Sequence, residues 1–367
     1  MKQALMGLVL ALGMFFSLGA TAAECSNTSE LAYIGTDGTS LRALRLNACA
    51  GQLAVIGPVA EVTKPRWLVA HPKLPLVYAA FDGGVIAYAM DRKTGALTKV
   101  NEADGGGAGT TFLAFDAASS TLLTANFGAG SVGALTVKPD GSLGDLVSTI
   151  KATGSGPHRR QTSPHAHSVS LDSTGRYALV ADLGADRIFV YRFDRTNHKL
   201  SEDSAFATPS GSGPRRALFG ASGRFVYALN ELTAEVMVLR WDAPRLSTVQ
   251  TLPLSSADFQ GTKSASEIAV SHDGRFVYVA NRGENTLMVF SVNAGTGELT
   301  LVQRLPSGGE APWAFDLHPS GKWLLVANYR SNRLNLFSMD AATGQLKDIA
   351  QALESPGPVS VTFVNQE

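Results

Sequence analysis

Short apolar runs and polar turns alternate along the whole chain. Seven segments share one pattern, in which a polar turn leads into an apolar run that ends in Asn, Asp or a small polar residue. Examples are LAYIGTD at 31–37, YALVADLG at 177–184 and FVYVANRG at 276–283. Within and after these runs the apolar positions recur with a period of two, which is typical of β-strands, and helical periodicity is almost absent.

The polar residue that ends each run serves as an anchor for aligning the segments. Successive anchors are 45, 44, 56, 48, 51 and 47 residues apart. Most anchors are followed by another strand, then by a turn that often contains Thr-Gly or Asp-Gly, and then by a further short strand. This is the pattern of consecutive hairpins. The seven anchors are Asp37, Asp82, Asn126, Asp182, Asn230, Asn281 and Asn328.

Four short strands per repeat, repeated seven times, predict an all-β fold, the seven-bladed β-propeller. The ends of the chain support this interpretation. Val359–Val364 has the pattern of an innermost strand with no strands after it, whereas the first segment lacks an innermost strand. We therefore expect the N- and C-terminal strands to complete one blade and close the ring, which removes open sheet edges.

The long interval between the third and fourth anchors contains a polar loop, Lys151–Pro164, with no strand pattern. Loops of this length inside compact domains often have a function. Three of its polar residues, Arg159, Arg160 and the adjoining Gln161, could cover a pocket and contact a substrate. The alternative is a solvated loop without a binding role.

The segment Met1–Ala23 has the features of a secretory signal peptide. Lys2 supplies the positive start, Leu5–Leu18 is an apolar core, and the following Ala-rich stretch offers small residues for cleavage. The apolar core is short for a membrane span, which needs about 20 residues, although a retained anchor is the alternative. We expect a periplasmic or secreted protein with no membrane contact after cleavage, in which residues 24–367 form a single propeller domain.

Two cysteines remain after such a cleavage, Cys25 and Cys49. An exported chain meets an oxidising compartment, so we expect them to form a disulfide that ties the mature N-terminus to the first strand pair. Two unpaired thiols are the alternative.

The charge balance excludes one class of partner. The 31 Lys and Arg residues equal the 31 Asp and Glu residues, so the chain lacks the basic field of a nucleic-acid-binding protein. It also lacks a Gly-x-Ser-x-Gly elbow, a phosphate-binding Gly-x-x-x-x-Gly-Lys loop, and a dinucleotide fingerprint in the right context. We therefore expect no nucleotide or other cofactor.

Residues at corresponding positions of different blades converge on one face of a propeller. His165 and His167 lie at the start of the fourth blade's innermost strand, and their spacing of two predicts that both side chains face the same way. Such a pair could bind a metal, act as acid and base, bind an anionic substrate, or form structural hydrogen bonds. No carboxylate lies near them in sequence, so we expect no metal.

Charged residues recur in the next two blades. Arg215 begins the fifth innermost strand, close to the repeat position of His165, while Glu231 and Arg282 each follow an anchor directly. Each could form a salt bridge between blades, but three such residues in successive blades favour a shared site. Asp182, an anchor beside Gly184, could join this site or cap a turn.

The chain resembles the seven-bladed propeller lactonase family, which includes bacterial 6-phosphogluconolactonase and fungal carboxy-muconate cyclase. The resemblance covers about residues 31–364. Five motifs occur in order on the expected blades: PHAHS at 164–168, DLGADR at 182–187, GPR at 213–215, NEL at 230–232 and NRG at 281–283.

This resemblance implies hydrolysis of a small lactone or carboxylate-bearing substrate without a metal. It places His165 or His167, Arg215, Glu231 and Arg282 in the active site. In the hydrolysis that we expect, His167 or Glu231 is the general base that acts on water. Two positions depart from the family pattern, since Arg216 replaces a histidine and Trp313 replaces an arginine, which could move the substrate's anion site. A lactone-forming cycloisomerase and a non-catalytic periplasmic binding propeller remain as alternatives.

Overall fold

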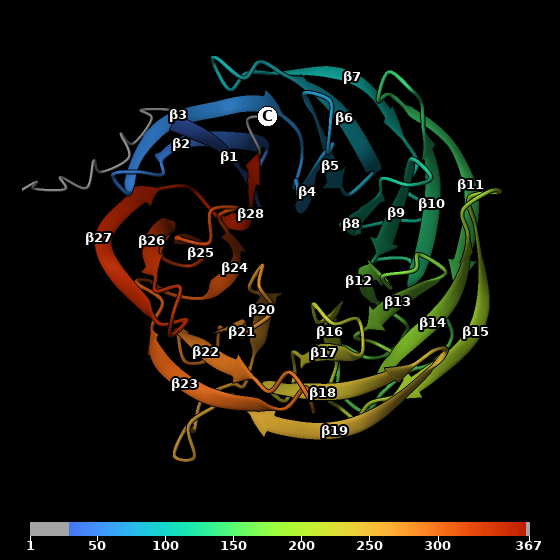
Figure 1. The fold of residues 1–367 in the computed structure, drawn as a ribbon. Coiled ribbons are helices and arrows are strands. Elements are labelled where there is room, and N and C mark those ends of the chain that lie inside the picture. The colour runs from blue at the N-terminus through green and yellow to red at the C-terminus, as the bar shows by residue number, and fades with distance from the viewer. Residues whose placement is uncertain (1–28, 365–367) are drawn as a thin grey trace, which may run out of the picture.

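The computed structural model describes residues 29–364, which form seven four-stranded antiparallel sheets arranged as a ring (Figure 1). This confirms the predicted seven-bladed propeller. We number the blades in chain order, beginning with the blade that contains both ends of the described chain. The predicted signal peptide and Cys25 lie outside the described residues. Cys49 lies in the exposed turn after β2, and its pairing with Cys25 stays a prediction.

The strands of each blade run from the centre of the ring outward in chain order, except in blade 1, which begins with the last strand. Blade 1 contains β28 (Pro358–Val364), β1 (Ser29–Thr36), β2 (Ser40–Asn47) and β3 (Gln52–Glu61). Blade 2 contains β4 (Trp67–Ala70), β5 (Leu76–Phe81), β6 (Gly84–Met90) and β7 (Leu97–Ala103). Blade 3 contains β8 (Thr110–Asp116), β9 (Thr121–Asn126), β10 (Ser131–Val137) and β11 (Leu143–Lys151). Blade 4 contains β12 (Ala166–Leu171), β13 (Tyr177–Asp182), β14 (Arg187–Asp194) and β15 (Lys199–Ala207). Blade 5 contains β16 (Pro214–Phe219), β17 (Phe225–Asn230), β18 (Glu235–Asp242) and β19 (Arg245–Pro253). Blade 6 contains β20 (Ala265–Val270), β21 (Phe276–Asn281), β22 (Thr286–Val292) and β23 (Leu299–Pro306). Blade 7 contains β24 (Pro312–Leu317), β25 (Trp323–Asn328), β26 (Arg333–Met339) and β27 (Leu346–Glu354).

The ring closes where the C-terminal strand β28 pairs with the N-terminal strand β1. Their register runs antiparallel from Leu31 opposite Val364 to Thr36 opposite Pro358. Phe363 of β28 packs edge-on against His318 of blade 7 with ring centroids 4.9 Å apart, and its backbone N–H donates to Asp316 at 2.9 Å. The predicted closure by the two chain ends is therefore confirmed.

The core lies between neighbouring blades. The second strand of most blades is buried along its whole length, as in β9, β13, β17 and β21, because a blade of a propeller has another blade on each face. A tyrosine in this strand repeatedly reaches the next blade. The hydroxyl of Tyr33 donates to the Gly95 carbonyl at 3.0 Å, Tyr78 to Gly141 at 2.8 Å, and Tyr278 to Gly344 at 3.0 Å.

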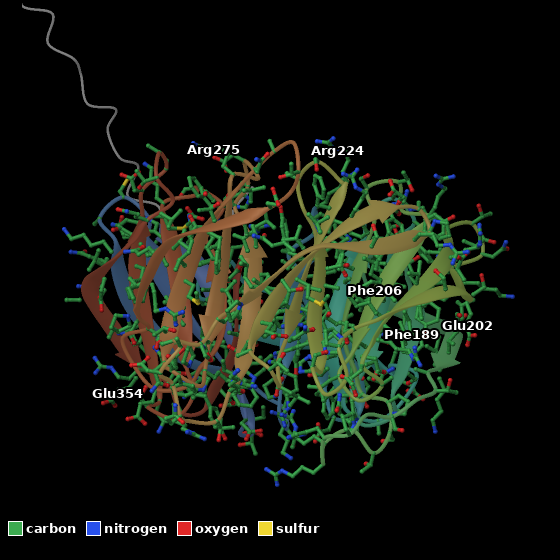
Figure 2. The ribbon with its side chains drawn as sticks, turned by 90° about the horizontal axis from the view of Figure 1, so that it is seen from below. Phe189, Glu202, Phe206, Arg224, Arg275 and Glu354 are labelled. Carbon is green, nitrogen blue, oxygen red and sulfur yellow. The ribbon has the colours of Figure 1, made fainter. Side chains whose placement is uncertain are left out.

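The two faces of the ring carry different turns. Arg224 and Arg275 directly precede the second strands β17 and β21, and in Figure 2 they lie at the upper rim of the ring. Glu354 is the last residue of β27 and lies at the lower rim. Because the strands alternate in direction, the starts of the innermost strands and the ends of the second strands lie at the same rim as Glu354. Among residues 29–364, no helix has the length and apolar character needed to cross a membrane.

Candidate active site

Six of the seven innermost strands have a shift in register close to their start. In blade 4, Ala166 pairs with Asp182 and Ser168 with Ala181, so His167 has no partner of its own. A β-bulge of this kind leaves one extra residue and re-aims its side chain. The extra residues of the six blades are Thr111, His167, Arg215, Ser266, Trp313 and Val359.

A second set of converging side chains comes from the residue directly after each second strand. Five of these residues line one cavity together with all of the bulge residues except Ser266: Asp37, Asp82, Phe127, Glu231 and Arg282. Asp37 and Asp82 therefore correspond to Glu231 and not to the anchor Asn230, which corrects the alignment of the first two repeats. In blade 2 the turn between β5 and β6 has only two residues. The difference of one residue between Asp82 and the anchor position was therefore not visible in the sequence.

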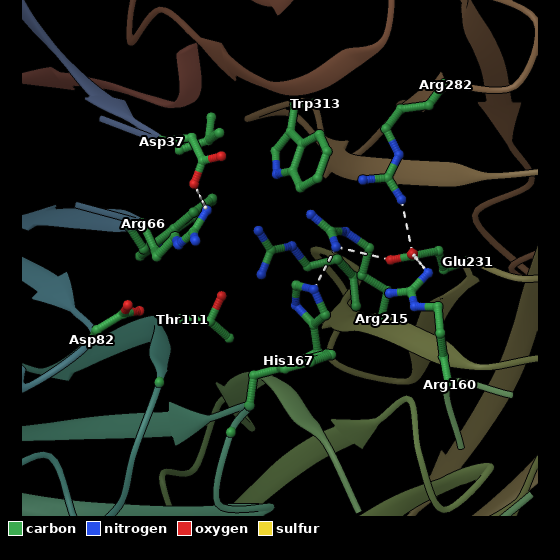
Figure 3. A pocket seen from close by; sticks show the side chains of 16 residues that line it. Asp37, Arg66, Asp82, Thr111, Arg160, His167, Arg215, Glu231, Arg282 and Trp313 are labelled. Carbon is green, nitrogen blue, oxygen red and sulfur yellow. Dashed lines mark hydrogen bonds and ion pairs between the residues drawn. The ribbon is translucent and has the colours of Figure 1, made fainter. Parts of the chain in front are cut away.

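With the exception of Ser266, the residues of the two sets surround a cavity of about 650 Å³ on the face where the innermost strands begin (Figure 3). This volume is typical of a site for a small molecule. Arginines, carboxylates and two tryptophans contribute to its walls, which are formed by Asp37, Arg66, Trp67, Asp82, Gly109, Thr111, Phe127, Gly128, Arg160, His167, Arg215, Arg216, Glu231, Arg282, Trp313 and Val359.

Glu231 is the centre of one wall. It is 1% exposed, and its two oxygens pair with three arginines: Arg215 at 2.9 Å, Arg282 at 2.8 Å and Arg160 at 2.5 Å. Burial opposes ionisation of this carboxyl, but the three guanidinium groups outweigh it and hold the pKa of Glu231 well below its usual range. Glu231 is therefore a carboxylate that orients cations, and a weak proton acceptor.

His167 is in contact with the same cluster. Its Nε2 accepts a hydrogen bond from Arg215 Nη1, because a guanidinium has only donors. A neutral imidazole bonded in this way carries its proton on Nδ1, which has no partner within the described part of the chain. Burial, and then the charges of Arg215 and Arg216, hold the pKa of His167 well below its usual range, so the ring is neutral at neutral pH.

Arg215 links these groups to the next blade. Its Nε donates to the Ser266 carbonyl at 2.5 Å, while its guanidinium lies between His167 and Glu231 (Figure 3). Burial lowers the pKa of Arg215, whereas the charge of Glu231 favours its protonated form. Trp313 completes the wall, with the Arg282 guanidinium 4.3 Å from its ring centroid, a cation–π contact.

Arg216 has a different set of partners from Arg215. It forms a two-bonded ion pair with Glu267, at 2.8 and 2.7 Å, and both side chains are buried. Trp67 and Phe112 lie on the guanidinium at 4.3 and 4.2 Å from their ring centroids. Its buried Nη1 has no partner among the described residues, so the two N–H groups on this nitrogen remain for a ligand.

The long loop before blade 4 is held down by buried side chains. Gln161 Nε2 donates to the Leu183 carbonyl at 2.8 Å and to Asp186 at 2.5 Å. Asp186 also accepts the backbone N–H groups of Gly211 and Gly213, at 2.6 and 2.8 Å. Gln161 thus holds the loop in place and positions Arg160 beside Glu231. Arg159 is exposed and does not line the cavity.

His165 and Asp182 also lie outside the cavity lining. Both histidine rings contact Phe127, with ring centroids 4.4 and 5.5 Å apart, but only His167 belongs to the cavity lining. Arg215 shares the repeat position of His167 and not of His165. The His165 ring stacks on Phe127 and contacts its carbonyl at 2.8 Å. Asp182 accepts the backbone N–H groups of His165, Gly184 and Ala185, which is the turn-capping geometry.

The opposite wall was missed by sequence reasoning. Figure 3 shows Asp37, Arg66, Asp82 and Thr111 across the cavity from Glu231. They come from blades 1 to 3, where no family motif drew attention to them. The signal available in the sequence was their repeat position, since Asp37 and Asp82 follow second strands and Thr111 occupies a bulge. Residues 29–364 contain no cluster of three or more His, Cys, Asp or Glu side chains arranged to hold a metal.

Comparisons with known proteins identify relatives of the chain. A family model described as Lactonase, 7-bladed beta-propeller matches residues 28–363. The 6-phosphogluconolactonase of Bacillus subtilis is 32% identical over 313 residues, which is 84% of this chain and 89% of the relative. A protein of Formosa agariphila with the same name is 29% identical over 295 residues, 77% of this chain and 83% of the relative.

Solved structures give the same result. The periplasmic gluconolactonase of Pseudomonas aeruginosa superposes with a TM-score of 0.86 at 32% identity, covering 93% of this chain and 100% of that one. A protein from Lactobacillus plantarum superposes with a TM-score of 0.86 at 29% identity, covering 92% and 100% of the two chains.

Proposed function

Because the chain belongs to the seven-bladed β-propeller lactonase family, we propose that it hydrolyses the ester bond of a small lactone in the central cavity. The observation that carries this proposal is the continuous contact from Glu231 through Arg215 to His167 at the cavity wall. It joins a neutral imidazole, which can accept a proton, to a guanidinium that can stabilise an oxyanion.

Water is the nucleophile in this reaction. His167 Nε2 takes a proton from water as the water oxygen attacks the carbonyl carbon, and Arg215 turns its N–H from His167 toward the developing oxyanion. The ring C–O bond then breaks, and the imidazolium returns the proton to the departing alkoxide. The product is a hydroxy acid, whose ionisation releases the proton that an assay can follow.

The remaining residues position these groups. Glu231 holds Arg215, Arg282 and Arg160 together, which concentrates positive charge where the carbonyl oxygen becomes anionic. Arg282 lies on Trp313 and also donates to Ser264 Oγ at 2.9 Å, so its orientation is fixed before a substrate binds. Such preorganisation is the usual source of electrostatic stabilisation in an active site.

The test is a panel of lactones assayed by proton release, with spontaneous hydrolysis subtracted. Wild-type protein should accelerate opening of at least one aldonic acid lactone, and the acceleration should disappear in His167→Ala protein that melts at the wild-type temperature. A lactone that stabilises the protein against heat but is never consumed would identify a binding protein instead.

We also propose that the chain is exported, and that residues 24–367 form the mature, single-domain protein. The charge and apolar core of Met1–Ala23 support this, as does the described periplasmic location of the Pseudomonas relative. Osmotic-shock fractionation should recover a shortened chain outside the cytoplasm, joined by a disulfide between Cys25 and Cys49. A full-length chain with two free thiols in the cytoplasmic fraction contradicts the proposal.

A further inference from the structure

The cavity has two walls with different chemistry. On one wall, three arginines converge on the single carboxylate of Glu231. On the facing wall, Asp37 and Asp82 supply two carboxylates from neighbouring blades, with Thr111 beside them (Figure 3). A ligand that spans the cavity therefore meets the arginine cluster at one end and, at the other, two carboxylates of which one is paired with Arg66.

The cations near the carboxylate wall already have partners. Arg66 pairs with Asp37 at 2.8 Å, and the Tyr329 hydroxyl donates to the other oxygen of Asp37 at 3.1 Å. Lys64 lies 3.8 Å from Asp82, and both of these side chains are about half exposed. Arg216, at the cavity lining, has Glu267 as its counter-ion, and its Nη1 has no partner among the described residues. Among residues 29–364, each of these three cations has a carboxylate partner, so this wall differs from a phosphate site built from unpaired cations.

Carboxylates and a threonine hydroxyl are suited to a different group. A carboxylate has about four lone-pair positions and accepts hydrogen bonds from hydroxyls, whereas a phosphate carries a charge of about −1.5 to −2 near pH 7. Placing that phosphate beside Asp37 and Asp82 brings like charges together, which is a strong means of rejecting a ligand. Hydroxyl groups at the same place gain acceptors.

We propose that Asp37 and Asp82, with Thr111, recognise the hydroxyl groups of the substrate, and that the substrate is therefore an unphosphorylated polyhydroxylated lactone. This rests on the proposed lactone hydrolysis and assigns its specificity. The carbonyl of the lactone faces Arg215 and His167, and the hydroxyl-bearing end faces the carboxylate wall. Asp82 is the main discriminating residue, because the charged partner it has among the described residues, Lys64, lies at 3.8 Å and is about half exposed.

The experiment compares kcat/KM for D-glucono-1,5-lactone and for its 6-phosphate ester, measured with the full mature chain. Wild-type protein should prefer the unphosphorylated lactone by about tenfold or more, since like-charge contacts are strongly unfavourable. Asp82→Asn should lower kcat/KM for the unphosphorylated lactone and raise it for the phosphate ester. Asp37→Asn should do the same and, in addition, release Arg66 for the phosphate.

A gain of activity on the phosphate ester cannot arise from misfolding, which makes it the decisive readout. Asp258→Asn is the matched control, because Asp258 is exposed and does not line the cavity; it should leave both values unchanged. Equal or greater wild-type activity on the phosphate ester overturns this inference and leaves lactone hydrolysis standing, as does an unchanged preference in both variants. Failure to hydrolyse any lactone overturns the proposed function as well.

Discussion

His167 and Arg215 occupy the same position in neighbouring blades, and each is the extra residue of a β-bulge at the start of an innermost strand. The bulges bring the imidazole Nε2 and the guanidinium Nη1 into hydrogen-bonding contact across the boundary between blades 4 and 5. One repeated backbone irregularity thus supplies two of the groups proposed to act on the substrate.

Removing the carboxylate that the arginines share should affect both stability and activity. In Glu231→Gln protein, Arg215, Arg282 and Arg160 lose their buried counter-charge and repel one another. Breaking a buried ion pair from one side costs about 3–5 kcal/mol, so we expect a fall of this size in the free energy of unfolding, measured with denaturant. Activity should fall about 100-fold or more, because Arg215 is no longer held.

The matched control for this change is Glu202→Gln, an exposed residue on β15 (Figure 2). It removes the same charge far from the cavity lining and should leave stability and rate within the error of measurement. Equal effects of the two substitutions would mean that Glu231 has no special role.

The pH dependence of the rate should reflect the neutral imidazole of His167. Burial and the adjacent arginines lower its pKa well below 6.5, so the form that accepts a proton persists as the pH falls below that value. The acid limb of kcat/KM should therefore lie below pH 6.5, with a constant rate from there to neutrality. An acid limb near or above pH 6.5 would contradict the assigned environment of the ring.

The same shift predicts how stability depends on pH. Below pH 6.5 the unfolded chain binds a proton at this histidine while the folded protein does not, so the free energy of unfolding should fall as the pH decreases from 6.5. His167→Gln should reduce this dependence. Thermal denaturation of both proteins between pH 5 and 7 measures the difference.

Arg159 and Arg160 are neighbours with different environments, which makes them a natural pair for comparison. Arg160 contacts Glu231 at 2.5 Å from the rim of the cavity, whereas Arg159 is exposed and outside its lining. Arg160→Ala should reduce kcat/KM about tenfold with little change in melting temperature, because its side chain is 41% exposed. Arg159→Ala should match wild type in both measurements, and similar losses in the two variants would exclude the proposed role of Arg160.

Closure of the ring should depend on the buried side chains of β28. Phe363 is 7% exposed and packs against His318, so Phe363→Ala should lower the free energy of unfolding by about 3–5 kcal/mol. Val55→Ala, at a side chain 56% exposed on β3, should cost about 0.5 kcal/mol or less. Urea denaturation monitored by fluorescence compares the two, and equal stabilities would indicate that closure contributes little.

The repeat pattern in the sequence was sufficient to predict the sheets, their number and the closure by Val359–Val364. Strand alternation depends on a period of two, which the apolar residues display directly. The bulges could not be predicted in this way, because an extra residue such as His167 leaves the apolar pattern of the strand intact while changing the direction of its side chain. This is why Arg215 was aligned with His165 and not with His167.

The site was predicted in part for a related reason. Arg215, Glu231 and Arg282 stood out because they are charged residues at strand ends in successive blades. Asp37 and Asp82 were placed in the anchor position, where Asn and Asp are common turn residues, and so their place on the cavity wall was hidden. Glu267 lies inside an innermost strand, and nothing in the sequence indicates that it pairs with Arg216.

The most direct test of the proposed active site is the rate of lactone opening by Arg215→Lys protein, with folding verified by its melting temperature. Lysine keeps the positive charge but cannot contact His167, Glu231 and the Ser266 carbonyl together as Arg215 does. We predict that kcat/KM falls about 100-fold or more on a lactone that the wild-type protein hydrolyses. A folded Arg215→Lys protein with the wild-type kcat/KM would contradict the assignment of the catalytic site to this cavity.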